Sequence, residues 1–306
     1  MHVDVTPPER QTTLRLNDGR TLAWSEWGPA NGLPVLFCTG AAMSGSLGFG
    51  ANELADLGMR LLAIDRPGLG ASTPHPQKTF ASWVDDVRQF LTAHGLRDVT
   101  TVGFSQGAPF ALALAGSGLV KAVAIVSGQD DLAWPSLAPL LHPDVAAMVR
   151  TARQDPAGFE QSFARMATLD GLWQLILGMS GERDRALYLS EPFGSAYQRA
   201  LREGFSQGAQ GYARDLVNAL GPWRVEPERI TVPVDLWYGG ADTSTVHSPD
   251  FGATLATRLP HATHVLDPQE GGSILWTRAR DILLRLRNHV PGNANLLGEG
   301  RASADG

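Results

Sequence analysis

Short apolar runs separated by glycine-containing loops dominate the pattern of hydrophobic and polar positions along the chain. Runs without polar alternation predict strands that are buried on both faces, and they occupy residues 34–38, 60–64, 99–102 and 120–126. Residues 12–16 and 21–27 instead alternate around Asn17-Asp18-Gly19 and predict a β-hairpin. Helical periodicity follows at residues 80–94 and 108–115. This order predicts an α/β fold with a mostly parallel central sheet flanked by helices.

The pattern changes between residues 131 and 229, where the strand signals vanish. Helical stretches cover residues 142–154, 158–179, 183–189 and 195–220. We interpret 131–229 as a helical cap inserted into a core that consists of residues 1–130 and 230–290. In the second part of the core, residues 230–238 and 263–266 predict strands, and 251–259 and 274–290 predict helices. Residues 291–306, rich in small and polar types, predict a disordered tail.

Bulky side chains are frequent in the predicted cap. They can line a pocket, or they can pack the insertion against the core, which is the commoner role of such residues. The residues concerned are Trp134, Trp173, Met179, Tyr188, Phe193, Tyr197, Phe205, Tyr212 and Trp223.

Charge and cysteine content narrow the class of protein. The net charge is −6, and no basic cluster is present, which argues against binding to nucleic acid or an anionic membrane. The chain has neither a signal-peptide pattern nor an apolar run of the roughly 18–20 residues that span a bilayer. The single cysteine, Cys38, excludes an internal disulfide and fits a reducing compartment. We therefore expect a cytoplasmic protein without metal or cofactor that acts on a small molecule; its oligomeric state stays open.

The stretch Gly103-Phe104-Ser105-Gln106-Gly107 lies between a predicted strand and a predicted helix. In this context the G-x-S-x-G pattern predicts a nucleophile elbow, in which a strained turn exposes the serine hydroxyl. The two glycines allow the backbone to bend sharply. The alternative is a glycine-rich junction without chemistry.

The chain resembles the α/β-hydrolase fold superfamily with a helical cap. The resemblance covers roughly residues 12–288 and rests on GFSQG, on DRPGLGAS at 65–72, and on the strand that leads into Gly239-Gly240-Ala241-Asp242. It implies that Ser105 is the nucleophile, that Asp242 is the acid, and that the N–H groups of Gln106 and Ala41 form the oxyanion hole. Asp130 is an alternative acid. Thr39-Gly40 stands where the family usually has His-Gly.

The general base is the main departure from the family. Its histidine usually follows the last strand in a Gly-His pair, but this chain has Gly272 at that place. We choose His247, five residues after Asp242, as the substitute. Other bases stay open at this stage: Glu270, His264, His261 and His75. The remaining histidines lie in peripheral segments: His2, His94, His142 and His289.

The sequence thus favours a serine hydrolase that acts on a small apolar ester, lactone or amide with a non-standard base. Two alternatives remain on the same fold. A lyase, cyclase or isomerase would retain activity in Ser105→Ala. A pseudoenzyme would bind a small ligand without turnover, and Gly272→His would then create esterase activity.

Overall fold

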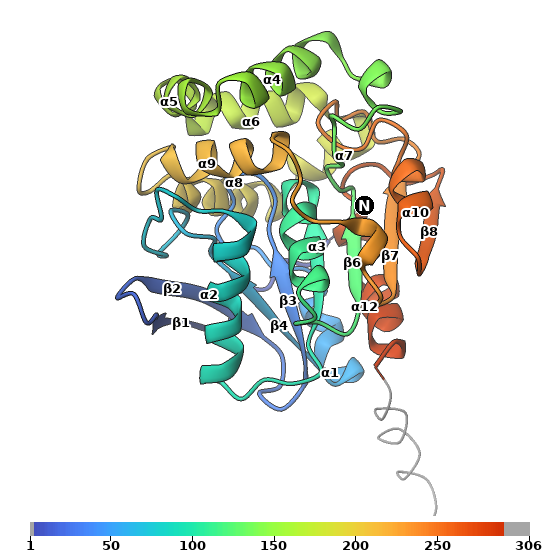
Figure 1. The fold of residues 1–306 in the computed structure, drawn as a ribbon. Helices are drawn as coiled ribbons and strands as arrows, with labels where there is room; N and C mark the ends of the chain where they lie inside the picture. Colours follow the sequence, from blue (N-terminus) through green and yellow to red (C-terminus); the bar gives the residue numbers. More distant parts are fainter. Residues whose placement is uncertain (1–2, 291–306) are drawn as a thin grey trace, which may run out of the picture.

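The computed structural model describes residues 3–290, and an eight-stranded sheet runs through their centre (Figure 1). The strand order is β1-β2-β4-β3-β5-β6-β7-β8. β2 is antiparallel to β1 and β4, whereas the other neighbours are parallel. This confirms the predicted fold class. The strands are β1 (Arg10–Arg15), β2 (Thr21–Trp27), β3 (Leu33–Cys38), β4 (Met59–Ile64), β5 (Thr100–Phe104), β6 (Val123–Val126), β7 (Val234–Gly239) and β8 (Ala262–Asp267).

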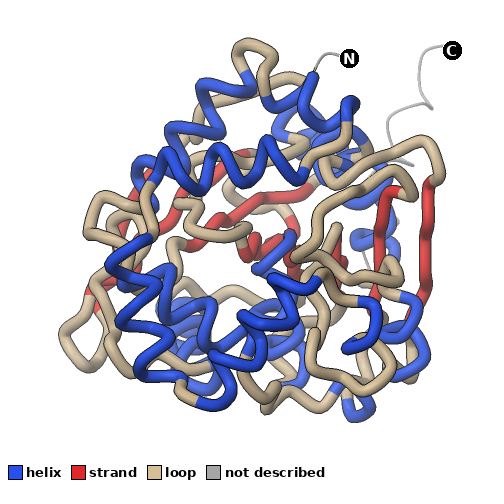
Figure 2. Tube along the Cα trace, turned by 90° about the horizontal axis from the view of Figure 1, so that it is seen from above, coloured by secondary structure: helices blue, strands red, loops and turns tan. Residues whose placement is uncertain are grey.

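Helices cover both faces of the sheet, as Figure 2 shows from above. Successive side chains of β3 alternate between the two faces: Val35 and Phe37 join one apolar cluster, and Leu36 and Cys38 join the other. Because both faces are buried, these strands read as continuous apolar runs. The first cluster includes side chains of α1 (Leu54–Leu57), α11 (Ile274–Thr277) and α12 (Ala279–Asn288), and the second those of α2 (Phe80–Ala93), α3 (Ala108–Gly116) and α10 (Ala253–Arg258).

Six helices form the insertion between β6 and β7 and lie above the sheet in Figure 1. We call this group the cap. Its helices are α4 (Pro143–Gln154), α5 (Pro156–Met166), α6 (Leu169–Met179), α7 (Glu182–Tyr188), α8 (Phe193–Gly204) and α9 (Gln210–Leu220).

Several predicted elements differ from the structure; the strand expected at 120–126, for example, begins only at Val123. The helix expected at 158–179 is two helices, because the Thr168 side chain accepts the Gly171 N–H and starts α6 afresh. The helix expected at 195–220 is interrupted where Gly208 adopts φ +87°. The C-terminal helix breaks at Arg278, which leaves the helical region with φ −121°. β7 begins only at Val234, after Pro233, which lacks an N–H to donate. The tail at 291–306 lies outside the described residues.

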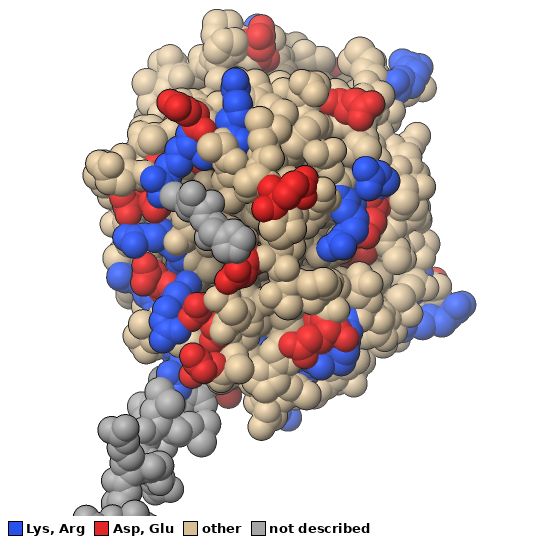
Figure 3. Space-filling view, turned by 180° about the vertical axis from the view of Figure 1, so that it is seen from behind, with Lys and Arg blue, Asp and Glu red and all other residues tan. Residues whose placement is uncertain are grey.

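The surface carries both signs of charge. On the face in Figure 3, acidic and basic side chains are interspersed, and neither sign forms a continuous patch there. Within residues 3–290, the helices are too short or too polar to cross a membrane.

Three buried charges connect the cap to the core. Asp215 of α9 lies 2.8 Å from Arg66 Nε and 2.5 Å from Lys78 Nζ, and all three side chains are fully buried. Arg66 and Lys78 belong to the segment between β4 and α2. Lys78 also donates to the carbonyl oxygen of Pro67 at 2.7 Å. One carboxylate therefore forms ion pairs with two cations at the boundary between cap and core.

We expect Asp215→Ala to lower the free energy of unfolding by about 3–5 kcal/mol, because Arg66 and Lys78 would stay buried without a counter-charge. Urea unfolding measures the change. Asp85→Ala is the matched control, since its ion pair with Arg88 is about half exposed and is worth less than about 1 kcal/mol. Equal losses in the two variants would contradict this role of Asp215.

Candidate active site

Ser105 occupies a sharp turn between β5 and α3. Its φ is +50°, a left-handed value that non-glycine residues rarely adopt, and a 3-10 turn over Ser105–Gly107 leads into α3. The flanking glycines serve a different purpose from the expected bend. A Cβ at Gly107 would lie 2.0 Å from the Cys38 carbonyl oxygen, and one at Gly103 would lie 2.9 Å from Ala108 Cα. They allow close packing, while the serine itself takes the strained conformation.

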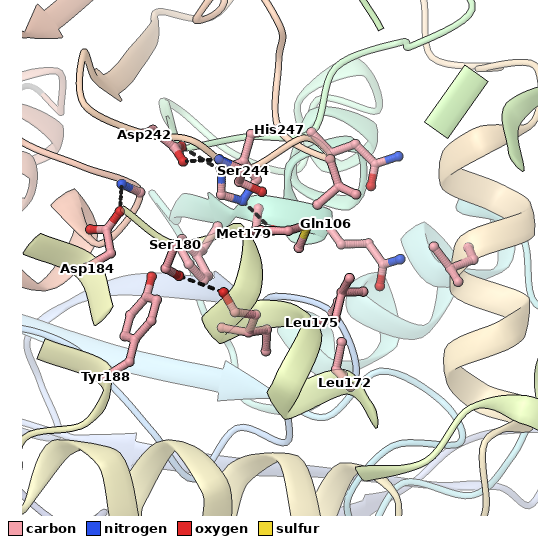
Figure 4. Close-up of a pocket in the computed structure, with 18 of the residues that line it drawn as sticks. Gln106, Leu172, Leu175, Met179, Ser180, Asp184, Tyr188, Asp242, Ser244 and His247 are labelled. Carbon is pink, nitrogen blue, oxygen red and sulfur yellow. Dashed lines mark hydrogen bonds and ion pairs between the residues drawn. The ribbon is translucent and has the colours of Figure 1, made fainter. Parts of the chain in front are cut away.

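His247 and Asp242 come from the loop between β7 and α10 and reach Ser105 together. His247 Nδ1 lies 2.6 Å from Asp242 Oδ2 (Figure 4). His247 Nε2 lies 3.0 Å from Ser105 Oγ. The side chains of His247 and Asp242 are largely buried, with exposed fractions of 10% and 4%. The Asp242 carboxylate accepts from Nδ1–H, which leaves Nε2 free to accept the serine proton. The structure thus brings the three sequence-predicted side chains into one hydrogen-bonded chain.

The residue after His247 attaches this loop to the end of β6. The Ser248 hydroxyl donates to Asp130 Oδ2 at 3.0 Å, and the Ser248 N–H donates to the Gly128 carbonyl oxygen at 3.0 Å. Burial raises the pKa of Asp130 to about 6. Asp130, the alternative acid, therefore supports the loop through Ser248, whereas the carboxylate bonded to His247 is that of Asp242.

The other candidate bases have partners elsewhere. Glu270 accepts from Arg183 at 3.0 Å and from the Thr277 hydroxyl at 2.8 Å. His264, on β8, places its Nε2 atom 2.7 Å from the Phe251 carbonyl oxygen. Of the histidines within residues 3–290, His247 is the one that lines the cavity beside Ser105, so His75, His94, His142, His261 and His289 do not line it. His2 lies outside the described residues.

Gly272 lies on the cavity wall, directly against the Asp242 carboxylate. A Cβ built there would lie 2.9 Å from Asp242 Oδ1. The surrounding turn is held from the cap: Asp184 of α7 accepts the N–H groups of Gly272 at 2.8 Å and Ser273 at 3.0 Å, and the Ser273 hydroxyl at 2.6 Å. Sequence reasoning missed Asp184, because nothing in α7 indicates a partner about 90 residues away.

The two expected oxyanion donors lie on the cavity wall. Gln106 is the second residue of its 3-10 turn, where N–H groups have no partner within the turn. The Ala41 N–H donates to no other described residue. Arg66 fixes the preceding backbone, since it donates to the carbonyl oxygens of Thr39 at 2.6 Å and Gly40 at 2.9 Å. The DRPGLGAS loop, which contains Arg66, thus supports this segment.

A cavity of about 890 Å³, which includes its opening to solvent, separates Ser105 from the cap. Of the nine bulky cap residues singled out in the sequence, Met179, Tyr188, Tyr197 and Tyr212 line it. Trp173 and Phe193 instead pack in the core. Leu172, Ile176 and Leu216 add apolar wall. Within residues 3–290, His, Cys, Asp and Glu side chains form no group of three that could hold a metal ion.

The chain has sequence relatives that are named non-heme chloroperoxidases. A stretch of 92 residues is 37% identical to non-heme chloroperoxidase CPO-A1 of Kitasatospora aureofaciens and covers 29% of this chain and 33% of that protein. A stretch of 101 residues is 35% identical to a non-heme chloroperoxidase of Streptomyces lividans and covers 31% of this chain and 35% of that protein. The matched stretches thus span about a third of these relatives.

The solved structures match over nearly the whole chain. A bromoperoxidase from Bacillus anthracis superposes with a TM-score of 0.69 at 19% identity, over 91% of this chain and 100% of that one. The esterase EaEST from Exiguobacterium antarcticum gives a TM-score of 0.65 at 16% identity, over 92% and 99%. Residues 34–279 match the family model described as alpha/beta hydrolase fold. The chain therefore belongs to the alpha/beta hydrolase fold family.

Proposed function

We propose that this protein is a serine hydrolase that cleaves a small, neutral ester, lactone or amide through an acyl-serine intermediate. One observation carries the proposal: Ser105 Oγ, His247 and Asp242 form a continuous hydrogen-bonded chain, with contacts of 3.0 and 2.6 Å, at the wall of a cavity. A serine hydroxyl becomes a useful nucleophile when an adjacent base accepts its proton, and a third group orients that base.

In the acylation half, Ser105 Oγ attacks the substrate carbonyl carbon while its proton moves to His247 Nε2. Asp242 stabilises the imidazolium through Nδ1–H and holds the ring in place. The carbonyl oxygen becomes an oxyanion, for which the N–H groups of Gln106 and Ala41 are the candidate donors. When the tetrahedral intermediate collapses, His247 returns the proton to the leaving oxygen or nitrogen, and the acyl group remains on Ser105.

In the deacylation half, a water molecule takes the place of the leaving group. His247 Nε2 accepts a proton from this water as its oxygen attacks the acyl carbon. The second tetrahedral intermediate breaks its bond to Ser105 Oγ, which recovers a proton from His247. The products are the carboxylic acid and the free serine.

The cavity favours an uncharged substrate. Its wall contains the carboxylates of Asp184 and Asp242 and, among the described residues, no lysine or arginine. An anionic substrate would meet repulsion without a compensating cation in a site of low dielectric constant. The apolar side chains from the cap favour hydrocarbon groups.

The relatives named chloroperoxidases and bromoperoxidase favour a second acceptor for the same acyl group. Hydrogen peroxide in place of water would attack the acyl carbon and release a peracid, which can oxidise a halide ion. The two reactions share acylation of Ser105. The ratio of peracid to carboxylic acid formed with added peroxide distinguishes the acceptors.

Ser105→Ala and His247→Ala are each expected to lower kcat for p-nitrophenyl ester hydrolysis by about 10⁴-fold, since either change removes a member of the proton-transfer chain. A fluorophosphonate probe is expected to label Ser105 in the unchanged protein. His264→Ala is the matched control and should stay within about twofold of the unchanged protein, because His264 contacts a backbone carbonyl away from the cavity. High residual turnover in Ser105→Ala would favour the non-hydrolytic alternative.

Gly272→Ala is expected to lower kcat by about tenfold, because the added methyl group would displace the Asp242 carboxylate and weaken its bond to His247. Gly272→His should be worse still and should not create activity. Steady-state kinetics measures both. Gly178→Ala is the control, because a Cβ there meets no atom within 4 Å. If Gly272→Ala and Gly178→Ala have the same kcat, Gly272 is not required for the placement of Asp242.

A further inference from the structure

Three consecutive cap helices each place one tyrosine on the cavity wall. Tyr188 belongs to α7, Tyr197 to α8 and Tyr212 to α9. Their exposed fractions are only 5%, 5% and 6%. None of the three hydroxyl groups has a hydrogen bond to another described residue. The cavity therefore has three buried phenols whose hydroxyls are unpaired within residues 3–290.

The fourth tyrosine of the chain shows the ordinary arrangement. Tyr238 is fully buried outside the cavity, and its hydroxyl donates to the Gly128 carbonyl oxygen at 3.1 Å. The three cap hydroxyls are not among the fully enclosed polar atoms without a partner, so they open onto the cavity. Phenylalanine would supply the same ring if packing alone were required, and a ligand that displaces water must pair with these hydroxyls or leave them unsatisfied. The cap does use phenylalanine at Phe163, whose ring lies 5.1 Å from that of Tyr212 and which lines the same cavity. The three hydroxyls are thus an addition to the wall that packing alone does not require.

The hydroxyls are arranged along the wall rather than at one point. The rings of Tyr188 and Tyr197 are 5.3 Å apart. In Figure 4, Tyr188 points with its hydroxyl toward the side of the cavity where Asp184 and Asp242 lie. Tyr212 packs further along, next to Phe163 on the α5 side. A ligand that extends from Ser105 under the cap would therefore lie beside these phenols.

These groups act as donors at neutral pH. Burial raises the pKa of each of the three phenols above the ordinary value of 10, so that all stay protonated. The Gln106 carboxamide, also at the wall, has no hydrogen-bond partner for its nitrogen or its oxygen. A chain of pure hydrocarbon would leave all of these groups unpaired.

We propose that the substrate portion under the cap is a neutral chain that carries an acceptor oxygen, such as an ether, ketone or second ester carbonyl, which the cap tyrosines bind. The inference rests on the proposed function and deepens it, because it names the substrate class of the same site. The apolar wall between the phenols accommodates the carbon chain, and the absence of a lysine or arginine from the described cavity wall disfavours a carboxylate in place of the neutral oxygen.

The test uses two pairs of esters of equal length. In the first pair, p-nitrophenyl hexanoate is compared with the ester in which an ether oxygen replaces one methylene of the acyl chain. In the second, butyl and methoxyethyl esters of the same acid place the oxygen on the alcohol side. For at least one pair, we expect Tyr188→Phe, Tyr197→Phe or Tyr212→Phe to lower the ratio of kcat/KM for the oxygen-containing ester to that for the hydrocarbon ester by about 3- to 10-fold. Tyr238→Phe should leave both ratios unchanged.

Binding to Ser105→Ala, followed by calorimetry, separates this inference from the proposed function. Tighter binding of the oxygen-containing esters, lost in the tyrosine variants, supports the substrate class even if the unchanged protein turns over none of them, in which case the proposed hydrolysis fails. Turnover with ratios that no tyrosine variant alters overturns the substrate class and leaves hydrolysis standing. Failure of every ester to bind would also overturn the proposed substrate class.

Discussion

The site depends on the attachment of one loop, which carries both Asp242 and His247. These side chains share a loop of a few residues, so their 2.6 Å contact is a local property of the chain. Their approach to Ser105 is not local, and it requires that the loop be fixed to the neighbouring strand. Ser248 provides this through its hydroxyl to Asp130 and its N–H to Gly128. Because Gln129 in turn donates its N–H to the Ser105 carbonyl oxygen at 3.0 Å, the end of β6 connects the serine turn to the histidine loop.

This arrangement explains why a glycine can stand where the family usually has histidine. In the proposed mechanism the imidazole comes from the β7–α10 loop, so the turn at 271–273 is free for another use. The Asp184 carboxylate accepts hydrogen bonds from the N–H groups of Gly272 and Ser273 in this turn. A Cβ at Gly271 would lie only 2.4 Å from that carboxylate. Such charge-assisted bonds to backbone N–H groups are stronger than neutral ones. The turn thereby becomes a point of attachment for the cap rather than a source of the base.

The inner strands could be predicted because they are buried on both faces and are largely apolar, whereas the hairpin at β1 and β2 was visible from its alternating pattern and its Asp-Gly turn. Helix ends were harder, since the break before α6 depends on one threonine side chain and the break before α9 on one glycine conformation. For the site, the pattern around Ser105 and the nearness of His247 to Asp242 were visible in the sequence. The sequence favoured His247 over Glu270 only through its nearness to Asp242, because a contact with Ser105 depends on loops more than 100 residues apart. The same limit concealed Asp184.

Arg66 connects the cap to residues 39–41, the segment that carries the Ala41 N–H, a candidate oxyanion donor. Its guanidinium donates to the carbonyl oxygens of Thr39 and Gly40 and pairs with Asp215 of α9. A planar guanidinium that serves all three acceptors at once has little freedom to tilt. The direction of the peptide plane that ends in the Ala41 N–H is therefore set by the same group that holds the cap. In the proposed mechanism, a shift of α9 would therefore disturb both the cavity wall and the N–H group that stabilises the substrate's oxyanion. The fit of the substrate under the cap and the stabilisation of its oxyanion thus depend on the same buried cation, Arg66.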